Sequence, residues 1–384
     1  MSRYEILNAL LHLLVFFLGA GIGSFLNVVI YRLPRGISVN QPRRSFCPTC
    51  KNQIPMWLNI PLLSWILLRG KCAKCSSSIS PRYLGVEFLT GVLFYAVFWK
   101  VGGDWLSLKD WGPQVLCLWI FVSLLVAGTF IDIEHFILPH EITIGGTVVG
   151  LISAAAVPAL VAEELHLRGF LISLASAALG LGGLWLVVEL GKLAFGRKRY
   201  AFDKPQSWSV TQPNDEEPPV VTLGDETYGW ADIFMRASDR MIINCSDLKV
   251  NEQAWQNVTA EVWMEKLKVR TASGELEEFS LENVTRLDGV TSQVVIPREA
   301  MGFGDVLFLM MIGSFAGWKA VLFTILVASL LGTVLAGFWK LVGRSEWSAK
   351  IPFGPYLAAG ALFWIFYGQE SLTWYFGLMT RGQM

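Results

Sequence analysis

The chain has 384 residues, of which 53% are hydrophobic and 16% are charged, and 16 of them are tryptophan. This composition excludes an ordinary soluble domain and a disordered chain, and abundant tryptophan is typical of the aromatic belts at membrane interfaces. The formal net charge is zero, so the orientation in a membrane depends on where Lys and Arg lie along the chain.

Eight apolar segments are predicted to be membrane-spanning helices, because a helix needs about 20 mostly apolar residues to cross the hydrocarbon layer. The first segment is too long for a signal peptide and has no small-residue cleavage site, so we expect it to remain as a span. The expected fold class is an all-α polytopic membrane protein. The predicted spans are residues 7–33, 83–101, 111–131, 142–162, 170–195, 303–316, 319–342 and 352–378.

The first span carries three glycines and one amide side chain. Gly19, Gly21 and Gly23 favour close packing against another helix, whereas a phosphate-binding loop would require a preceding strand. Asn27 lies near the end of this span. It either donates a hydrogen bond to a neighbouring helix or lines a binding site.

The loop over residues 32–82 holds nine Lys or Arg residues and no Asp or Glu. Basic loops stay on the cytoplasmic side of a membrane, so this loop is predicted to be cytoplasmic. With eight spans, both chain termini would then lie outside the cytoplasm.

Four cysteines in this loop form two CxxC pairs separated by 21 residues. Such spacing is typical of a zinc site with four thiolate ligands, and disulfides are not expected in the reducing cytoplasm. Four protein thiolates leave no open coordination position, so the zinc would be structural. A redox-active dithiol pair is the alternative. The predicted ligands are Cys47, Cys50, Cys72 and Cys75.

Two aspartates lie where predicted spans meet the cytoplasmic interface. Asp132 follows the third span, and Asp305 comes directly before the apolar run of the sixth. Because both positions are at a similar depth, the two carboxylates can converge if these spans pack together. The alternative is that Asp305 is only a helix N-cap and Asp132 only an interfacial charge.

A pair of close carboxylates has a specific chemistry. One keeps a proton while the other deprotonates a water molecule, which permits peptide hydrolysis without a covalent intermediate. The helix dipole would favour the anion of Asp305 at its helix start. Gly302 and Gly304 would let a substrate strand or a partner helix approach the backbone closely.

About 100 mostly polar residues separate the fifth and sixth spans. Residues 204–219 are rich in Pro, Ser, Gln and acids and are predicted to be a linker, whereas alternating patterns such as 261–270 predict the strands of a small sheet. The basic residues 197–199 place this β-rich insertion in the cytoplasm. The expected divisions of the chain are 1–31 (first transmembrane helix), 32–82 (zinc-binding loop domain), 83–195 (helices 2–5 with the first aspartate), 196–298 (β-rich insertion) and 299–384 (helices 6–8).

The segment Gly302–Asp305 looks like the GxGD motif of intramembrane aspartyl proteases, and the chain as a whole resembles the type IV prepilin peptidases. The agreement covers the spans and the basic loop and leaves out the insertion. The other matching motifs are Ser24–Pro34, Asn59–Pro61, Leu68–Cys72, Arg82 with Tyr83 and Glu87, Ile131 with Asp132, Leu138 with Pro139, and Pro352–Tyr356.

The resemblance implies cleavage of the basic leader of prepilins or type II secretion pseudopilins at the cytoplasmic face of the bacterial inner membrane. On the matching positions, it implies that Asp132 and Asp305 are the catalytic acids. Many members also methylate the new N-terminus with S-adenosylmethionine, for which this chain has no independent cofactor fingerprint. Glu87 matches a family acid that holds the substrate or serves methyl transfer; alternatively it pairs with Arg82.

The expected partners are prepilin or pseudopilin substrates and membrane lipid, with no nucleic acid, and no oligomeric state is predicted. Leu307 and His140 replace a Lys and an Asp that family members often carry, and the missing Lys predicts a shifted pH dependence of activity. A transporter or channel with ion-binding intramembrane acids is the rival class, although no inverted repeat supports it. A membrane thiol oxidoreductase would place its CxxC pairs at the oxidising face instead.

Overall fold

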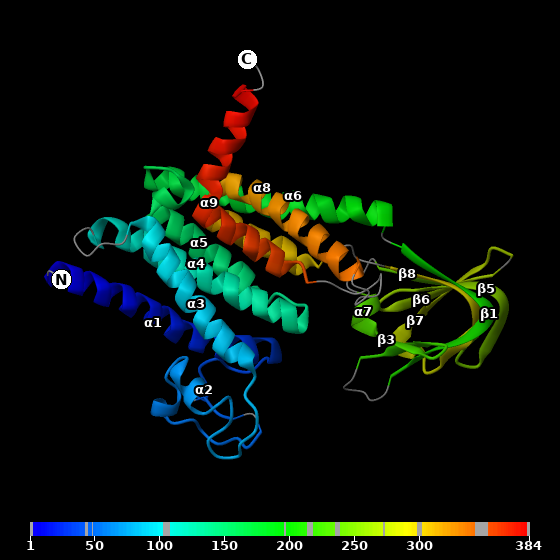
Figure 1. The fold of residues 1–384 in the computed structure, drawn as a ribbon. Coiled ribbons are helices and arrows are strands. Elements are labelled where there is room, and N and C mark those ends of the chain that lie inside the picture. Colours follow the sequence, from blue (N-terminus) through cyan, green and yellow to red (C-terminus); the bar gives the residue numbers. More distant parts are fainter. Residues whose placement is uncertain are drawn as a thin grey trace. The chain divides into compact units, whose positions relative to one another are not determined.

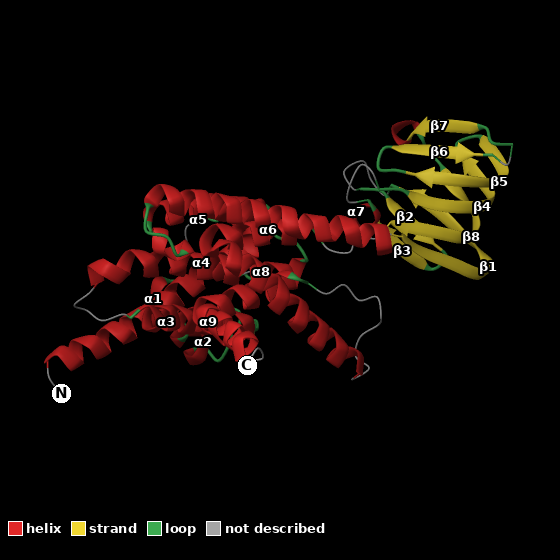
Figure 2. Ribbon diagram, turned by 90° about the horizontal axis from the view of Figure 1, so that it is seen from above, coloured by secondary structure: helices red, strands yellow, loops and turns green. Residues whose placement is uncertain are grey.

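The structure is a computed structural model that describes residues 3–42, 45–47, 49–102, 108–195, 197–212, 218–234, 239–271, 273–297, 302–341 and 352–381. The chain forms two compact units, one from Met1–Trp185 with Met301–Met384 and the other from Leu186–Ala300. The first is helical and the second is built on a β-sheet (Figures 1 and 2).

In the part of the chain that the structure describes, seven long helices make up the helical part. Among the described residues, five helical segments are long and apolar enough to cross a membrane, at Glu5–Arg35, Pro81–Val101, Lys109–His135, His166–Gly191 and Phe303–Leu335. The chain is therefore a multi-pass membrane protein. The helices are α1 (Arg3–Arg32), α3 (Pro81–Val101), α4 (Leu108–His135), α5 (His140–Ala156), α6 (His166–Phe195), α8 (Phe303–Leu341) and α9 (Gly354–Arg381).

The predicted fourth span is shorter than expected. Helix α5 ends at Ala156, and Pro158 begins a separate 3-10 turn, Pro158–Val161. A residue that precedes a proline is pushed away from the helical conformation, so the continuous span predicted to residue 162 is wrong at its end.

The sixth and seventh predicted spans are the two parts of α8. Its backbone is non-helical at Gly317, where φ is 82° and ψ is 171°. A Cβ placed on Gly313 would lie 2.9 Å from Val321 Cγ2, whereas residues eight apart in a straight helix are separated by about 12 Å. The chain therefore turns sharply at Gly317, inside the gap that the sequence predicted between these two spans.

Helices α1 and α3 pack with their backbones in contact. A Cβ on Gly19 would lie 2.7 Å from Phe94 Cβ, and one on Gly23 would lie 2.7 Å from Glu87 Cα. Small residues permit this approach. The packing role predicted for these glycines is confirmed at Gly19 and Gly23, but Gly21 has nothing within 4 Å and does not take part.

The basic loop between α1 and α3 contains short elements only. They are the 3-10 turns η1 (Leu33–Arg35) and η2 (Met56–Leu58) and the helix α2 (Leu63–Leu67). The buried Arg32 side chain donates hydrogen bonds to the backbone oxygens of Ser38, Val39 and Pro42 and so fixes the start of the loop.

The insertion folds as one antiparallel sheet of eight strands in the order β3-β2-β1-β8-β4-β5-β6-β7. Its first and last strands pair with each other, and Arg197 lies opposite Pro297. The chain therefore enters the sheet at β1 and leaves it at β8 at neighbouring points. The strands are β1 (Arg197–Thr211), β2 (Val220–Leu223), β3 (Glu226–Gly229), β4 (Met241–Val250), β5 (Gln253–Val262), β6 (Lys266–Arg270), β7 (Leu276–Ser280) and β8 (Leu287–Pro297).

One hydrophobic core supports this sheet. Trp208 of β1 is its largest fully buried side chain, and the short helix α7 (Trp230–Ile233) adds Trp230 and Ile233. The linker predicted for residues 204–219 is thus wrong over 204–211, which belong to β1. The register of β1 against β8 shifts between Ala201 and Gln206, and Pro205 is tolerated there because it needs no ladder hydrogen bond.

Candidate active site and cysteine cluster

The two aspartates singled out in the sequence come together in the helical unit. Asp132 lies in the last turn of α4, and Asp305 lies in the first turn of α8. They are 5% and 8% exposed, and the helix ends that carry them pack together, because a Cβ on Gly128 would lie 2.8 Å from Phe308 and one on Gly304 would lie 3.0 Å from Leu138 Cβ. The convergence predicted from membrane depth is therefore present.

The first turn of α9 holds one of these carboxylates. The backbone N–H of Gly354 donates a hydrogen bond of 2.9 Å to Asp132 Oδ2. A Cβ at position 354 would lie 2.7 Å from the same oxygen, so a side chain there would displace the carboxylate. The sequence indicated this segment only through the resemblance of Pro352–Tyr356 to a family motif and did not identify the contact.

Asp305 follows Gly304, which meets another segment, whereas a Cβ on Gly302 would meet nothing nearer than Asp305 Oδ2 at 3.7 Å. Because α8 begins at Phe303, Asp305 is its third residue and is not the N-cap. A Cβ on Gly304 would lie 3.0 Å from Leu138 Cβ, so this glycine lets the segment after α4 approach α8. Among the residues that the structure describes, Asp305 Oδ1 has no hydrogen-bond partner, which leaves it available to a substrate or a water molecule.

The end of α4 is also tied to the basic loop and to α3. Arg82 forms an ion pair with Glu134, two residues after Asp132. Arg35 Nη1 lies 3.5 Å from His135 Nε2. The pairing of Arg82 with Glu87 that the sequence offered as an alternative is wrong, because the Arg82 guanidinium is directed to Glu134.

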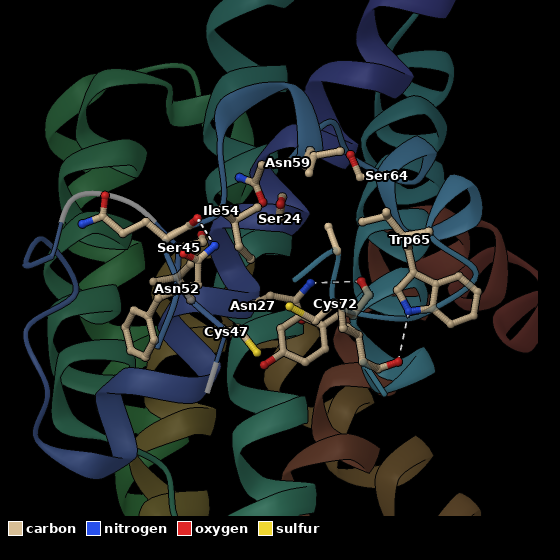
Figure 3. Close-up of a pocket in the computed structure, with 18 of the residues that line it drawn as sticks. Ser24, Asn27, Ser45, Cys47, Asn52, Ile54, Asn59, Ser64, Trp65 and Cys72 are labelled. Atoms are coloured by element: carbon tan, nitrogen blue, oxygen red, sulfur yellow. Dashed lines mark hydrogen bonds between the residues drawn. The ribbon is translucent and has the colours of Figure 1, made fainter. Parts of the chain in front are cut away.

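A cavity of about 600 Å³ lies between α1, α3 and the loop. Figure 3 shows Ser24 and Asn27 of α1 around it, with Asn59, Ser64 and Trp65 of the loop. The two aspartates are not among the described residues that line it. The cavity and the aspartate pair are therefore separate candidate sites.

Asn27 and Glu87 hold the walls of this cavity. Asn27 Nδ2 donates to the Tyr83 backbone oxygen at 3.0 Å, and Glu87 Oε2 accepts from the Leu62 N–H at 2.7 Å. Asn27 thus both bonds a neighbouring helix and lines a cavity, which combines the two expected roles. Glu87 is the one carboxylate among the described residues that line the cavity.

The four predicted cysteines form one cluster. Their Sγ atoms lie within 4.8 Å of one another, and those of Cys47 and Cys75 are 3.8 Å apart. Tetrahedral zinc with bonds of about 2.3 Å holds its sulfur ligands about 3.8 Å apart. The donor set and its spacing can therefore hold a metal ion.

Each CxxC pair is a turn of the same construction. In the first, Lys51 N donates to Cys47 O, Cys47 N to Asn52 O and Ile54 N to Ser45 O. In the second, Ser76 N donates to Cys72 O, Cys72 N to Ser77 O and Ile79 N to Gly70 O. Lys51 and Ser76 share a left-handed conformation, with φ of 57° and 56°. The loop thus brings together two cysteine turns of equivalent construction.

The thiols of the cluster differ in acidity. Backbone hydrogen bonding at Cys50 and the Ser77 hydroxyl lower the pKa of Cys47 to about 6. The Asn52 amide favours the thiolate of Cys50, but burial and three neighbouring thiols raise its pKa to about 11. The Ser77 hydroxyl lowers the pKa of Cys75. Hydrogen bonds thus favour the thiolate, the form that binds metals, at Cys47 and Cys75.

Comparison with known proteins was made on the whole chain. Residues 17–101 match the bacterial peptidase A24 N-terminal domain, and residues 119–203 and 283–337 match the type IV leader peptidase family. The gap at residues 204–282 falls within the β-rich insertion. No solved structure matches the chain.

Three relatives are each named prepilin leader peptidase/N-methyltransferase. The protein from Neisseria gonorrhoeae is 37% identical over 224 residues, or 51% of this chain and 71% of the relative. That from Stutzerimonas stutzeri is 28% identical over 93% of this chain and 91% of its own length. That from Myxococcus xanthus is 39% identical over 48% of this chain and 50% of its own length.

These matches cover the basic loop, the end of α4 that carries Asp132 and the start of α8 that carries Asp305. The chain belongs to the type IV leader peptidase family.

Proposed function

We propose that this chain is a prepilin leader peptidase/N-methyltransferase in which Asp132 and Asp305 are the catalytic acids. The observation that supports this most directly is the presence of two buried carboxylates on the packed ends of α4 and α8. Family membership supports the peptidase reaction over ion transport, the rival class considered for the intramembrane acids.

The pair would act on a peptide bond through one shared proton. Two carboxylates at close range resist ionising together, so one stays protonated and polarises the scissile carbonyl while the other removes a proton from the attacking water. The N–H of Gly354 stabilises negative charge on Asp132, and the unpartnered Oδ1 of Asp305 offers a contact to the substrate. Because the pair titrates as a unit, we assign the roles to the pair.

Replacing either acid tests this reaction. General acid–base groups contribute about 10²- to 10⁴-fold to a rate, so Asp132→Asn and Asp305→Asn should each lose cleavage by that order in an assay with purified prepilin. Asp110→Asn, in the first turn at the other end of α4, is the matched control and should retain activity. Full cleavage by either substituted protein would refute the assignment.

The membrane arrangement that fits this reaction has eight crossings. The helices α1, α3, α4, α5, α6 and α9 and the two parts of α8 account for them, and the basic loop sets the cytoplasmic side. The aspartate pair would then open to the cytoplasmic face of the bacterial inner membrane. Alkaline phosphatase is active only outside the cytoplasm. Fused after residue 384 it should be active, because the C-terminus would lie on that side. An inactive but stably expressed fusion would contradict this arrangement.

We propose that the cysteine cluster holds a structural zinc ion. The fit of its sulfur spacing and its two equivalent turns supports this. Cys47→Ser should abolish the zinc of the purified protein, measured by elemental analysis, because a structural site needs all four thiolates. Cys117→Ser, which changes a half-buried thiol of α4 outside the cluster, should retain one zinc per chain. A wild-type protein without zinc would contradict the proposal.

We propose that S-adenosylmethionine binds in the cavity beside Glu87 and Asn27. This molecule supplies a methyl group on a positively charged sulfonium. Glu87 offers a carboxylate to attract that charge, and Tyr31, Tyr83 and Trp65 offer aromatic surface. Loss of a charged partner typically costs about tenfold or more in affinity. Equilibrium dialysis should therefore show weaker binding to Glu87→Gln and unchanged binding to Asp132→Asn. Equal binding to wild type and Glu87→Gln would exclude this site.

A further inference from the structure

The basic loop carries a cluster of large apolar side chains that the structure leaves uncovered. Trp57 is 73% exposed and Leu67 is 79% exposed. A soluble loop rarely leaves so many large apolar groups together in water. We call these side chains the apolar loop surface; its members are Trp57, Leu63, Ile66 and Leu67.

The helix α2 is apolar on two sides. Ser64, Trp65 and Leu68 line the cavity, and Trp65 is fixed there because its Nε1 donates to the Ile79 backbone oxygen at 3.2 Å. Leu63, Ile66 and Leu67 are not among the cavity-lining residues and point to the open side. The cavity therefore accounts for one side of α2 and leaves the other without a partner among the described residues.

One hydrogen bond and the length of α3 place this segment at the depth of the membrane helices. The N–H of Leu62 donates to Glu87, and Glu87 lies five residues, or about 8 Å along the helix, beyond Arg82 in α3. Arg82 and Lys100 are near the two ends of this helix and about 27 Å apart along it, which matches the hydrocarbon thickness of about 30 Å. The start of α2 therefore lies below the level at which α3 enters the membrane.

The positive charge of the loop favours anionic lipid headgroups as its surroundings. Residues 32–82 contain nine Lys or Arg and no acid, so the loop attracts the anionic headgroups of the cytoplasmic leaflet. An apolar surface bordered by basic residues at this depth is the pattern of a segment that rests in the membrane interface.

We propose that the apolar loop surface inserts into the acyl region of the cytoplasmic leaflet, so that α2 separates the cavity from lipid. Trp57 lies at the interface, where tryptophan is favoured. Anionic lipid is thus a binding partner of the cysteine-containing loop. This inference depends on the membrane orientation and does not depend on the peptidase or methyltransferase reactions.

Labelling of the unmodified protein tests the insertion directly. The full chain is placed in nanodiscs of phosphatidylglycerol and phosphatidylethanolamine that contain a lipid with a diazirine on its acyl chain, then irradiated and digested with trypsin. Cleavage after Lys51 and Arg69 releases the peptide 52–69, which holds the whole apolar loop surface. The peptide 75–82 of the same loop, released by cleavage after Lys74 and Arg82, is the internal control.

The expected result is acyl-chain labelling of the peptide 52–69 severalfold above that of the peptide 75–82, and weaker labelling when phosphatidylcholine replaces the anionic lipid. Equal or absent labelling of 52–69 would overturn the proposal. Cross-linking of the peptide 52–69 to a second copy of the chain or to added prepilin, in place of lipid labelling, would also overturn it, because protein would then cover the surface.

Two single-site variants with a photoreactive residue test which side of the loop meets lipid. Benzoylphenylalanine at Leu67 should capture lipid under irradiation, whereas the same residue at the exposed Lys71 should not. Retention of zinc in both proteins controls for folding. Lipid capture at Lys71 and not at Leu67 would place the opposite side of the loop against the membrane and refute the assignment.

Discussion

The Asp132 carboxylate is held by the backbone of Gly354 at the start of α9. Gly354→Ala would place a Cβ 2.7 Å from Asp132 Oδ2, so the carboxylate must shift. Misplacement of a reacting group by about 1 Å can cost about 10²-fold in rate, and we expect a loss of this order in kcat for prepilin cleavage. Gly377→Ala on the same helix, where a Cβ meets nothing within 4 Å, should leave kcat unchanged. Equal activity of both variants would contradict the positioning role.

The ion pair of Arg82 with Glu134 also acts on the position of Asp132, through the last turn of α4. Both side chains are less than one third exposed, so the pair is worth about 1 kcal/mol, or about fivefold in rate if all of it acts on the site. Arg82→Gln and Glu134→Gln should each lower cleavage by about this factor, and the double variant should be no worse than either. Lys100→Gln, which breaks the pair with Glu370 at the other end of α3, is the control. Additive losses in the double variant would show that the pair is not the cause.

Among single residues, the sequence predicts those whose role follows from their position along one helix. Asp132 and Asp305 were found because each stands at the end of an apolar run, and their convergence followed from membrane depth. The Gly354 contact could not be found in this way, because it joins positions 222 residues apart through one backbone amide. The Arg82 partner was mistaken for the same reason: Glu87 is near in sequence, but Glu134 is near in space.

Among the elements, α8 depends on one glycine. Gly317 has a φ of 82° and a ψ of 171°, a conformation that costs other residues about 1–3 kcal/mol. Gly317→Ala should therefore lower the thermal unfolding midpoint of the purified protein and reduce the folded yield. Gly337→Ala, in the second part of α8 with nothing within 4 Å of its Cβ, should not. An unchanged midpoint for Gly317→Ala would show that the turn does not need glycine.

The elements predicted best are those whose limits are set locally. The gap between the sixth and seventh spans contains Gly317, and the two CxxC turns appear where their spacing indicated. The start of the sheet was missed because β1 carries Pro205, Lys204 and several polar residues, which read as a linker. Only pairing with β8 and burial of Trp208 make that segment a strand.

For the whole molecule, the insertion is the main departure from the family pattern. Its paired first and last strands return the chain to its starting point, which is the arrangement that lets a separate unit be inserted in a fold. The family match stops at residue 203, within β1, and resumes at residue 283, just before β8. The sequence predicted a β-rich unit with nearly these limits, but not the sheet order, which depends on long-range pairing.

Deletion of residues 197–297 tests what this unit contributes. If the unit docks substrate, which is the role we favour, the deleted protein should keep its zinc and its kcat while its KM for prepilin rises. A fall in kcat at unchanged KM would instead indicate a role in placing Asp305, which follows the insertion closely. Unchanged kcat and KM would exclude both roles.

The central claim is that two buried aspartates cleave the leader, at a site separate from the cavity proposed for methyl transfer. Its most direct test is incubation of the purified chain with prepilin and S-adenosylmethionine, with mass spectrometry of the product. Wild type should yield a cleaved and methylated N-terminus, Glu87→Gln a cleaved and unmethylated one, and Asp132→Asn and Asp305→Asn intact prepilin. Cleavage by either aspartate variant would contradict the account.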